Sequence, residues 1–515
     1  MKRIENTFRN IIWGTVNKFI ILFLPFVMRT MIIKILGVEY VGLGSLFTSL
    51  LQVLNLAELG IGAAITFSLY KPIAEKDEKM ICALMNLYKK VYRIIGIIVL
   101  VIGLIILPFL PNLIKGEVPN NINIYYLYMI YLINTVLTYW LFAYKTILLT
   151  VNQRSDIISN ISSVLYILQY MYQIIVIAIW KNYYLYIIIT PIITILNNLI
   201  GAYMANKKYP NYICKGVLPK DKEKDIRKRV YGLILQKICA TTRNSLDSIF
   251  ISSFIGLSMV AVYNNYYMIM DAIVGFLAII TSSMTASVGN SIAVENIEKN
   301  YNDMNKMNFI YMWIAGWATI CLACLYQPFM QIWLGKQYMF SYITVVLFCI
   351  YFYSLKMGDI ISTYSQGAGL WWEGKYRAAV EAILNIILNY ILGKKYGVNG
   401  VIAGTLISLL TINFGYGSTI IFKYYFKGKE VLEYFKFHAM YASVTIFIAI
   451  VTYMLCGLMP DRGIGYLIIK GIICLIIPNI LYVLLYRKTK YYLEAKEFFK
   501  NILKKIPKLD KMIKV

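Results

Sequence analysis

Long apolar runs recur along the whole chain and are separated by short polar segments. Runs such as 94–110 and 464–486 are long enough to cross the hydrocarbon core of a membrane, which takes roughly twenty residues of helix. A buried helix in a water-soluble protein more often carries about ten to fourteen such residues. The pattern therefore predicts an all-α integral membrane protein with about fourteen transmembrane helices.

The predicted spans follow a pattern of six, six and two. The first six lie near residues 10–36, 41–69, 81–110, 122–149, 157–180 and 183–204. The second six lie near 230–255, 258–290, 306–334, 340–366, 377–395 and 398–422, and the last two lie near 437–458 and 464–487. We therefore expect an N-terminal lobe (1–204), a cytoplasmic linker (205–229), a C-terminal lobe (230–422), a final helix pair (437–487) and a cytoplasmic tail (488–515).

A weak internal repeat supports this division. The pattern Gly37-x-x-x-Val41 recurs as Gly256-x-x-x-Val260, and Pro108 is matched by Pro328, at an offset of 219 or 220 residues. Each predicted block has an even number of spans, so the two copies keep the same orientation in the membrane. They would be related by an axis along the membrane normal, as in the parallel repeats of some transporters.

The charge distribution gives the orientation. The chain carries 51 Lys and Arg against 25 Asp and Glu, a net charge of +26, and most of the basic residues fall in alternate loops. Cytoplasmic loops are enriched in Lys and Arg, so both termini are predicted in the cytoplasm. The basic, amphipathic tail from Arg487 is expected to lie on anionic lipid. No basic stretch accompanies a nucleic-acid-binding fold, so nucleic acid is not expected as a partner.

Soluble enzyme chemistry is not expected. The eight cysteines are scattered, mostly within apolar runs, where thiols behave as small hydrophobic groups, so neither a disulfide nor a metal site is predicted. The pair Cys321-x-x-Cys324 lies in a predicted helix without the strands of a redox fold. No nucleotide-binding loop or catalytic triad is present, which excludes an ATP-driven pump on this chain alone.

Charged residues inside the predicted spans are the best candidates for a functional site, because an ionised group in hydrocarbon is costly and normally faces a bundle interior or a cavity. The basic candidates lie on the first, seventh and tenth spans: Lys18, Arg29, Lys237, Arg243 and Lys356. Two of them have an acidic residue nearby on the same helix, Asp247 after Arg243 and Asp359 after Lys356, so a structural ion pair competes with a substrate role.

Polar groups line other spans. Gln52 and Asp271 are 219 residues apart, so both repeat copies place a polar group at the equivalent point of their second helix. That equivalence favours a cavity-facing position for both. Asn385 and Asn389 lie one turn apart and are expected to form hydrogen bonds between helices.

Short motifs resemble those of the bacterial polysaccharide (Wzx-type) flippases of the multidrug/oligosaccharidyl-lipid/polysaccharide exporter superfamily. They are Leu36-Gly37-x-Glu39-Tyr40-x-Gly42-Leu43, Leu56–Gly62, Gln366–Trp371 and Gly397–Val401, and the resemblance spans roughly residues 5–425. It implies two six-helix lobes around a central cavity, in a bacterial cytoplasmic membrane. It also implies transport of an undecaprenyl-diphosphate-linked oligosaccharide to the outer leaflet by alternating access, beside a polysaccharide polymerase and glycosyltransferases. No cofactor is implied, and the coupling ion, proton or sodium, stays open.

The candidate residues fit such a substrate, because a diphosphate attracts Lys and Arg in a low-dielectric cavity. We expect Lys18, Arg29, Lys237 and Arg243 to hold the diphosphate, with Gln52, Asp271 and Lys356 also lining the cavity.

Alternatives of the same fold are a lipid II flippase and a multidrug/cation antiporter, although an antiporter would rely on acidic residues. A membrane polysaccharide polymerase or ligase would usually carry a large extracytoplasmic loop, which this sequence lacks. A structural membrane scaffold would leave the intramembrane charges unexplained.

Overall fold

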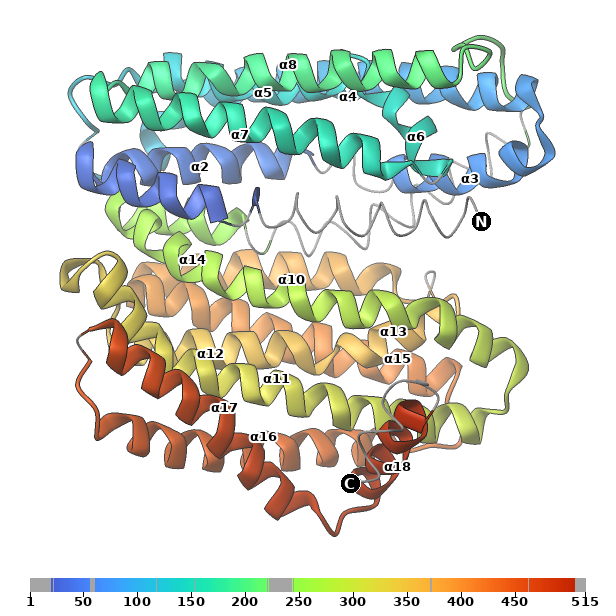
Figure 1. Cartoon of the computed structure of the whole chain (residues 1–515), viewed down its shortest axis with the longest axis vertical. Coiled ribbons are helices and arrows are strands. Elements are labelled where there is room, and N and C mark those ends of the chain that lie inside the picture. The colour runs from blue at the N-terminus through green and yellow to red at the C-terminus, as the bar shows by residue number, and fades with distance from the viewer. Residues whose placement is uncertain are drawn as a thin grey trace. The chain divides into compact units, whose positions relative to one another are not determined.

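The fold is known from a computed structural model of the chain (Figure 1). The structure describes residues 20–21, 23–55, 61–116, 118–152, 154–219, 221, 243, 245–370, 373–461 and 463–504. The predicted span at 10–36 is described only in its second half, and the span at 230–255 only from residue 243 onwards with residue 244 excepted. The chain divides into two compact units, Met1–Asn264 and Asn265–Val515.

The first unit is built from helices with short connections. Its elements are α2 (Val38–Leu54), α3 (Ile61–Glu75), α4 (Glu78–Ile106), the 3₁₀ turn η2 (Leu107–Leu113), α5 (Ile124–Trp140), η3 (Ala143–Thr146), α6 (Ile147–Val151), α7 (Ser155–Ile179) and α8 (Tyr183–Lys208). Within this unit α4, α5, α7 and α8 pack side by side as long helices (Figure 1). Asn123 and Asn182 cap α5 and α8, each accepting hydrogen bonds from backbone N–H groups of the first helical turn.

The second unit is also built from helices, with no strand in its described residues. Its elements are α10 (Leu257–Val294, whose first residues belong to the first unit), α11 (Ile297–Trp333), η4 (Lys336–Tyr338), α12 (Tyr342–Met357), α13 (Asp359–Gly367), α14 (Lys375–Ser408), a π-helical stretch η5 (Leu409–Tyr416), α15 (Gly417–Tyr424), α16 (Val431–Gly457), α17 (Ile464–Tyr486) and α18 (Lys490–Lys504). Helix α11 is central to this unit, because it contacts α12, α16, α17 and α18.

Among the described residues, nine helices are long and apolar enough to cross a membrane, or ten if the bent pair α5 and η3–α6 forms one span. The protein is therefore a multi-pass integral membrane protein, as the apolar pattern predicted. The total of fourteen spans and their six, six and two division remain predictions. The 48° bend after Trp140, where Phe142 adopts a left-handed backbone with φ 57°, was not predicted from the sequence.

Two predicted spans, 377–395 and 398–422, are joined in α14 by a sharp reversal. Gly397 has non-helical angles, φ 60° and ψ −137°, at the predicted break. The arms pack so closely that a Cβ added at Gly400 would lie 1.9 Å from the Leu392 carbonyl oxygen. Between them, Asn385 donates hydrogen bonds to Thr405 at 3.0 Å and to Ser408 at 3.4 Å. These bonds confirm the interhelical role predicted for the asparagine.

The repeat seen in the sequence has a structural counterpart. Gly37 and Gly256 both have positive φ angles, 129° and 136°, which favour glycine. Each donates its N–H to the carbonyl five residues earlier, Ile32 or Ile251, and each precedes the first residue of a helix, α2 or α10. The two copies therefore share one helix–turn–helix geometry at this point.

The described part of the tail forms α18, as expected for an amphipathic segment. Tyr492 stacks on Trp313 of α11, and Tyr491 contacts Phe437 of α16. Leu493 and Phe499 are exposed. One part of the apolar side thus packs on protein, and contact of the exposed part with anionic lipid remains a prediction.

Candidate functional site

Among the predicted site residues, Arg29 has the surroundings that best suit the binding of an anion. Its guanidinium Nη2 donates to Ser45 Oγ of α2 at 2.9 Å, and its Nε is buried without a hydrogen-bond partner. In the part of the chain that the structure describes, the titratable groups near Arg29 are the phenols of three tyrosines, with no carboxylate among them. Arg29 is thus a half-buried cation whose guanidinium still has an N–H group free to donate a hydrogen bond.

Those three tyrosines come from two helices, and we call them the tyrosine wall. They are Tyr131 of α5 and Tyr183 and Tyr186 of α8. The hydroxyls of Tyr131 and Tyr183 lie 3.3 Å apart, and Tyr183 also donates to the Tyr40 carbonyl at 3.1 Å. The backbone of Gly44 approaches this wall so closely that an added Cβ would lie 2.8 Å from both hydroxyls. Glycine at this position therefore makes room for the tyrosines.

Gln52 lies farther along the same face of α2. Its Oε1 accepts a hydrogen bond from Ser245 Oγ at 3.1 Å, which brings the helical segment around residue 245 against α2. Ser45 and Gln52 are seven residues apart, so they share one helix face about 10 Å apart along the axis. This face of α2, defined by Ser45 and Gln52, is here called the polar face. It joins Arg29 to the segment that carries Arg243.

Arg243 is buried, two residues before Ser245. Asp247, its predicted ion-pair partner, is also buried and accepts a hydrogen bond from Tyr263 at 2.8 Å. Both a structural and a substrate role for Arg243 therefore stay open. Lys18 and Lys237 lie outside the described residues.

Lys356 has the ion pair that its sequence spacing suggested. Its Nζ lies 2.8 Å from Asp359 Oδ2, and Tyr311 donates to the same carboxylate. The lysine is buried, whereas Asp271 of α10 is exposed and lies within electrostatic range of it. With its charge balanced in this way, Lys356 is a weaker candidate for binding an anion than Arg29.

We expect Lys356→Gln to destabilise the protein by about 2 kcal/mol, because Asp359 would keep its charge in a mostly buried site after losing its counter-ion. The double variant Lys356→Gln/Asp359→Asn should recover at least half of that loss. Thermal unfolding of the purified protein in detergent measures both. Loss of transport by Lys356→Gln with unchanged unfolding would contradict the structural role and return the lysine to the substrate site.

A cavity of about 650 Å³ opens beside the start of α2, on the side predicted as extracytoplasmic. Its lining includes Glu39, Lys115 and Asn121. Ser258 donates to Glu39 at 2.9 Å, and the Lys115 ammonium donates to the Phe254 carbonyl at 2.6 Å. Glu39 and Ser258 are 219 residues apart, so this hydrogen bond joins equivalent positions of the two repeat copies.

The backbones also meet at this point. A Cβ added at Gly42 would lie only 2.2 Å from the Leu257 carbonyl oxygen. We name this contact, made by Glu39, Gly42, Leu257 and Ser258, the repeat contact. The sequence motif contained Glu39 and Gly42, but its linear spacing carried no sign that they touch the second copy.

Comparisons with known proteins give one family match and several matches in fold. The model of a family described as "Polysaccharide biosynthesis protein" matches residues 7–285, just over half of the chain. No curated protein matches the sequence. Among solved structures, the lipid II flippase MurJ in an inward closed conformation has a TM-score of 0.66 at 16% identity, covering 93% of this chain and 99% of that chain.

Matches with lower TM-scores include MATE transporters. An inward-facing multidrug resistance MATE family transporter of the MOP superfamily has a TM-score of 0.52 at 15% identity, covering 79% of this chain and 96% of that one. The Vibrio cholerae MATE transporter VcmN has a TM-score of 0.51 at 14% identity, with 82% and 99% covered. At these identities the likeness shows the fold, which is the fold of MurJ and the MATE transporters.

Proposed function

Because the chain belongs to the polysaccharide biosynthesis protein family, we propose that it flips an undecaprenyl-diphosphate-linked oligosaccharide across the bacterial cytoplasmic membrane. The oligosaccharide would be a unit of capsule, O-antigen or another surface polysaccharide. Movement from the cytoplasmic to the outer leaflet would deliver it to a polymerase, after glycosyltransferases have built it on the inner side. The transporter fold supports a role that makes and breaks no covalent bond.

The surroundings of Arg29 are the observation that supports this proposal most directly. Arg29 lies in a predicted membrane segment, no described carboxylate is near it, and its buried Nε–H has no hydrogen-bond partner. These three features suit the binding of an anionic ligand. The planar guanidinium group of Arg29 can donate two parallel hydrogen bonds to phosphate oxygens, which strengthens binding in a low-dielectric site. The hydroxyls of Tyr131, Tyr183 and Tyr186 are suitable donors and acceptors for the first sugar.

The polar face of α2 gives the diphosphate more than one cation. Arg29 contacts this face at Ser45, and the segment with Arg243 contacts it at Gln52. A spacing of about 10 Å between the two contacts suits a ligand larger than one phosphate group. We propose that Lys18 and Lys237 extend the same cationic surface.

The repeat contact would serve as the extracytoplasmic gate. It consists of one hydrogen bond between side chains and of close backbone packing between the first turns of α2 and α10. Such a contact can separate without breaking a hydrophobic core, and Gly37 and Gly256 offer hinge points. Opening would connect the tyrosine wall with the 650 Å³ cavity and release the glycan outward.

A lipid II flippase is the alternative that one observation favours, namely the higher TM-score with MurJ than with the MATE transporters. The polysaccharide family match points instead to a polysaccharide precursor. A multidrug/cation antiporter is less well supported, because Arg29, with no described carboxylate beside it, would repel an organic cation.

Transport by the purified full-length protein in liposomes tests the proposal. The probe is undecaprenyl diphosphate carrying a fluorescent disaccharide, and a membrane-impermeant quencher reports how much of it is in the outer leaflet. We expect the protein to make the inner-leaflet probe accessible, whereas protein-free liposomes should leave it protected.

Two outcomes would contradict this function. Faster movement of labelled lipid II than of the disaccharide probe would identify a lipid II flippase. Uptake of an organic cation by the same liposomes, with the lipid-linked probe left in place, would identify an antiporter.

A further inference from the structure

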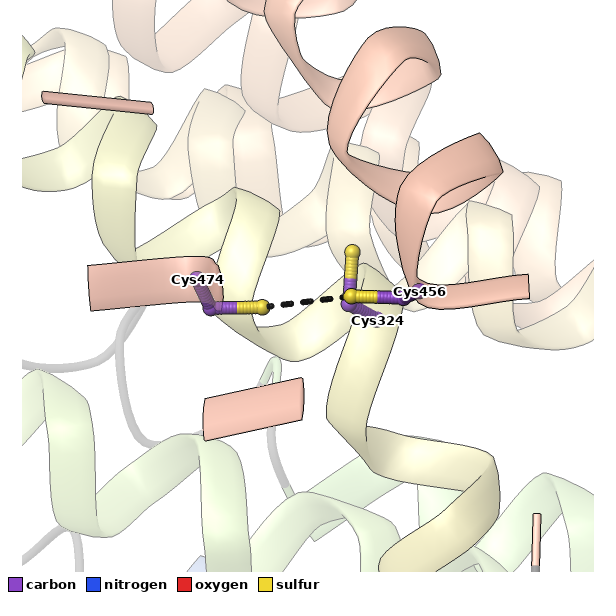
Figure 2. Close-up of side chains that lie close together, drawn as sticks. All are labelled: Cys324, Cys456 and Cys474. Atoms are coloured by element: carbon purple, nitrogen blue, oxygen red, sulfur yellow. Dashed lines mark hydrogen bonds between the residues drawn. The ribbon is translucent and has the colours of Figure 1, made fainter. Parts of the chain in front are cut away.

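Three cysteines that are far apart in the sequence meet in the second unit (Figure 2). Cys324 comes from α11, Cys456 from the end of α16 and Cys474 from α17. All three are buried, and their sulfur atoms lie within 4.8 Å of one another. The sequence prediction treated these residues as separate hydrophobic groups, since spacing along the chain does not show which helices become neighbours.

The spacing of the sulfurs matches a metal centre better than a disulfide. Metal–thiolate bonds are about 2.3 Å long, so three sulfurs around one ion form a triangle with edges of about 4 Å. The Cys456 and Cys474 sulfurs are 3.9 Å apart. A disulfide would need these two sulfurs to approach to about 2.05 Å, and it would leave the third thiol unused.

The surroundings favour a soft ion with few ligands. Within the described residues, the donor group contains three sulfurs and no carboxylate or imidazole. Zinc prefers four ligands, whereas thiolates select soft ions such as copper(I). Cys321, one turn from Cys324 on α11, directs its sulfur to the Cys474 carbonyl oxygen at 4.0 Å instead.

The cluster also has a cation close by. Cys324 and Cys456 line a small cavity of about 60 Å³ together with Lys470 and Asp461, which form an ion pair. Each thiol that becomes a thiolate ligand gives up its proton. Copper(I) bound by three thiolates would therefore release three protons to solvent and add two negative charges, which the buried Lys470 ammonium, already paired with Asp461, would offset only in part.

We propose that Cys324, Cys456 and Cys474 form a three-sulfur binding site for a soft monovalent metal ion, with copper(I) as the expected ligand. The ion would tie α16 and α17 to α11, the central helix of the second unit. Because only the folded protein brings the three sulfurs together, binding would stabilise this helix cluster. The oxidation state of the ion does not change.

Anaerobic titration of the full-length protein in detergent tests the site. The probe is copper(I) supplied with a coloured competing chelator, which keeps single thiols from holding the ion. We expect one ion per chain for the unmodified protein, with a rise in its thermal unfolding midpoint. Cys474→Ser should lose both effects, while the matched control Cys349→Ser, a buried cysteine outside the cluster, should keep them.

Cys456→Ala provides a second variant should Cys474→Ser fail to fold, since Cys456 lies next to the end of α16. It should also lose the bound ion. Equal copper binding by the unmodified protein and Cys456→Ala would overturn the proposal, as would no binding by the unmodified protein. Peptide masses that locate a Cys456–Cys474 disulfide after mild oxidation, in protein that binds no copper, would also overturn it.

Discussion

Replacing Arg29 with glutamine is expected to lower transport by about tenfold or more, because the variant loses a charge-assisted contact with the diphosphate worth roughly 1.5–3 kcal/mol. Arg29→Lys should lose less, since it keeps the charge but not the two-pronged donor geometry. The measurements are the rate of leaflet exchange of the lipid-linked probe in liposomes and the amount of surface polysaccharide in cells.

The thermal unfolding midpoint separates this role from a structural one. Arg29 has no described counter-ion, so the glutamine variant should unfold at an unchanged or higher temperature while its transport falls. Arg93→Gln is the matched control, because Arg93 is exposed on α4. Wild-type transport by Arg29→Gln at equal protein level would remove Arg29 from the site.

Locking the repeat contact should stop transport almost completely. The test introduces Glu39→Cys and Ser258→Cys together in a chain whose eight native cysteines have been replaced. A bifunctional methanethiosulfonate reagent, which spans the gap left by the shorter cysteine side chains, should join the two positions and hold the proposed gate closed. A reducing agent should restore transport.

Each single cysteine variant serves as a control, because it experiences the same reagent without forming the cross-link. Both should transport at nearly the rate of the cysteine-free parent. Full transport by the cross-linked double variant, with the cross-link verified by its mass, would show that this contact does not need to open.

Features that depend on a residue's own type or on residues a few positions away could be predicted from the sequence. The break at Gly397, the hydrogen bonds of Asn385 and the ion pair of Lys356 with Asp359 all follow from spacing or from local backbone chemistry. The repeat was visible for a related reason, since two copies of one glycine turn require glycine at both Gly37 and Gly256.

Features that depend on which helices become neighbours could not be predicted. Arg29 was a candidate, but Tyr131 and Tyr183 belong to helices more than a hundred residues away and resemble the many other tyrosines of the chain. The three clustered cysteines were missed for the same reason. The bend after Trp140 was missed because the residues around it contain neither proline nor glycine, the usual signals of a helix break.

The reversal within α14 bears on how the chain enters the membrane. Its first arm carries Glu381, Asn385 and Asn389 along one face, and two of these side chains find partners at Thr405 and Ser408 of the second arm. A lone first arm would expose those groups to lipid. We therefore expect the translocon to hold the first arm until Gly397 and the second arm have emerged, and to release the two as one hairpin.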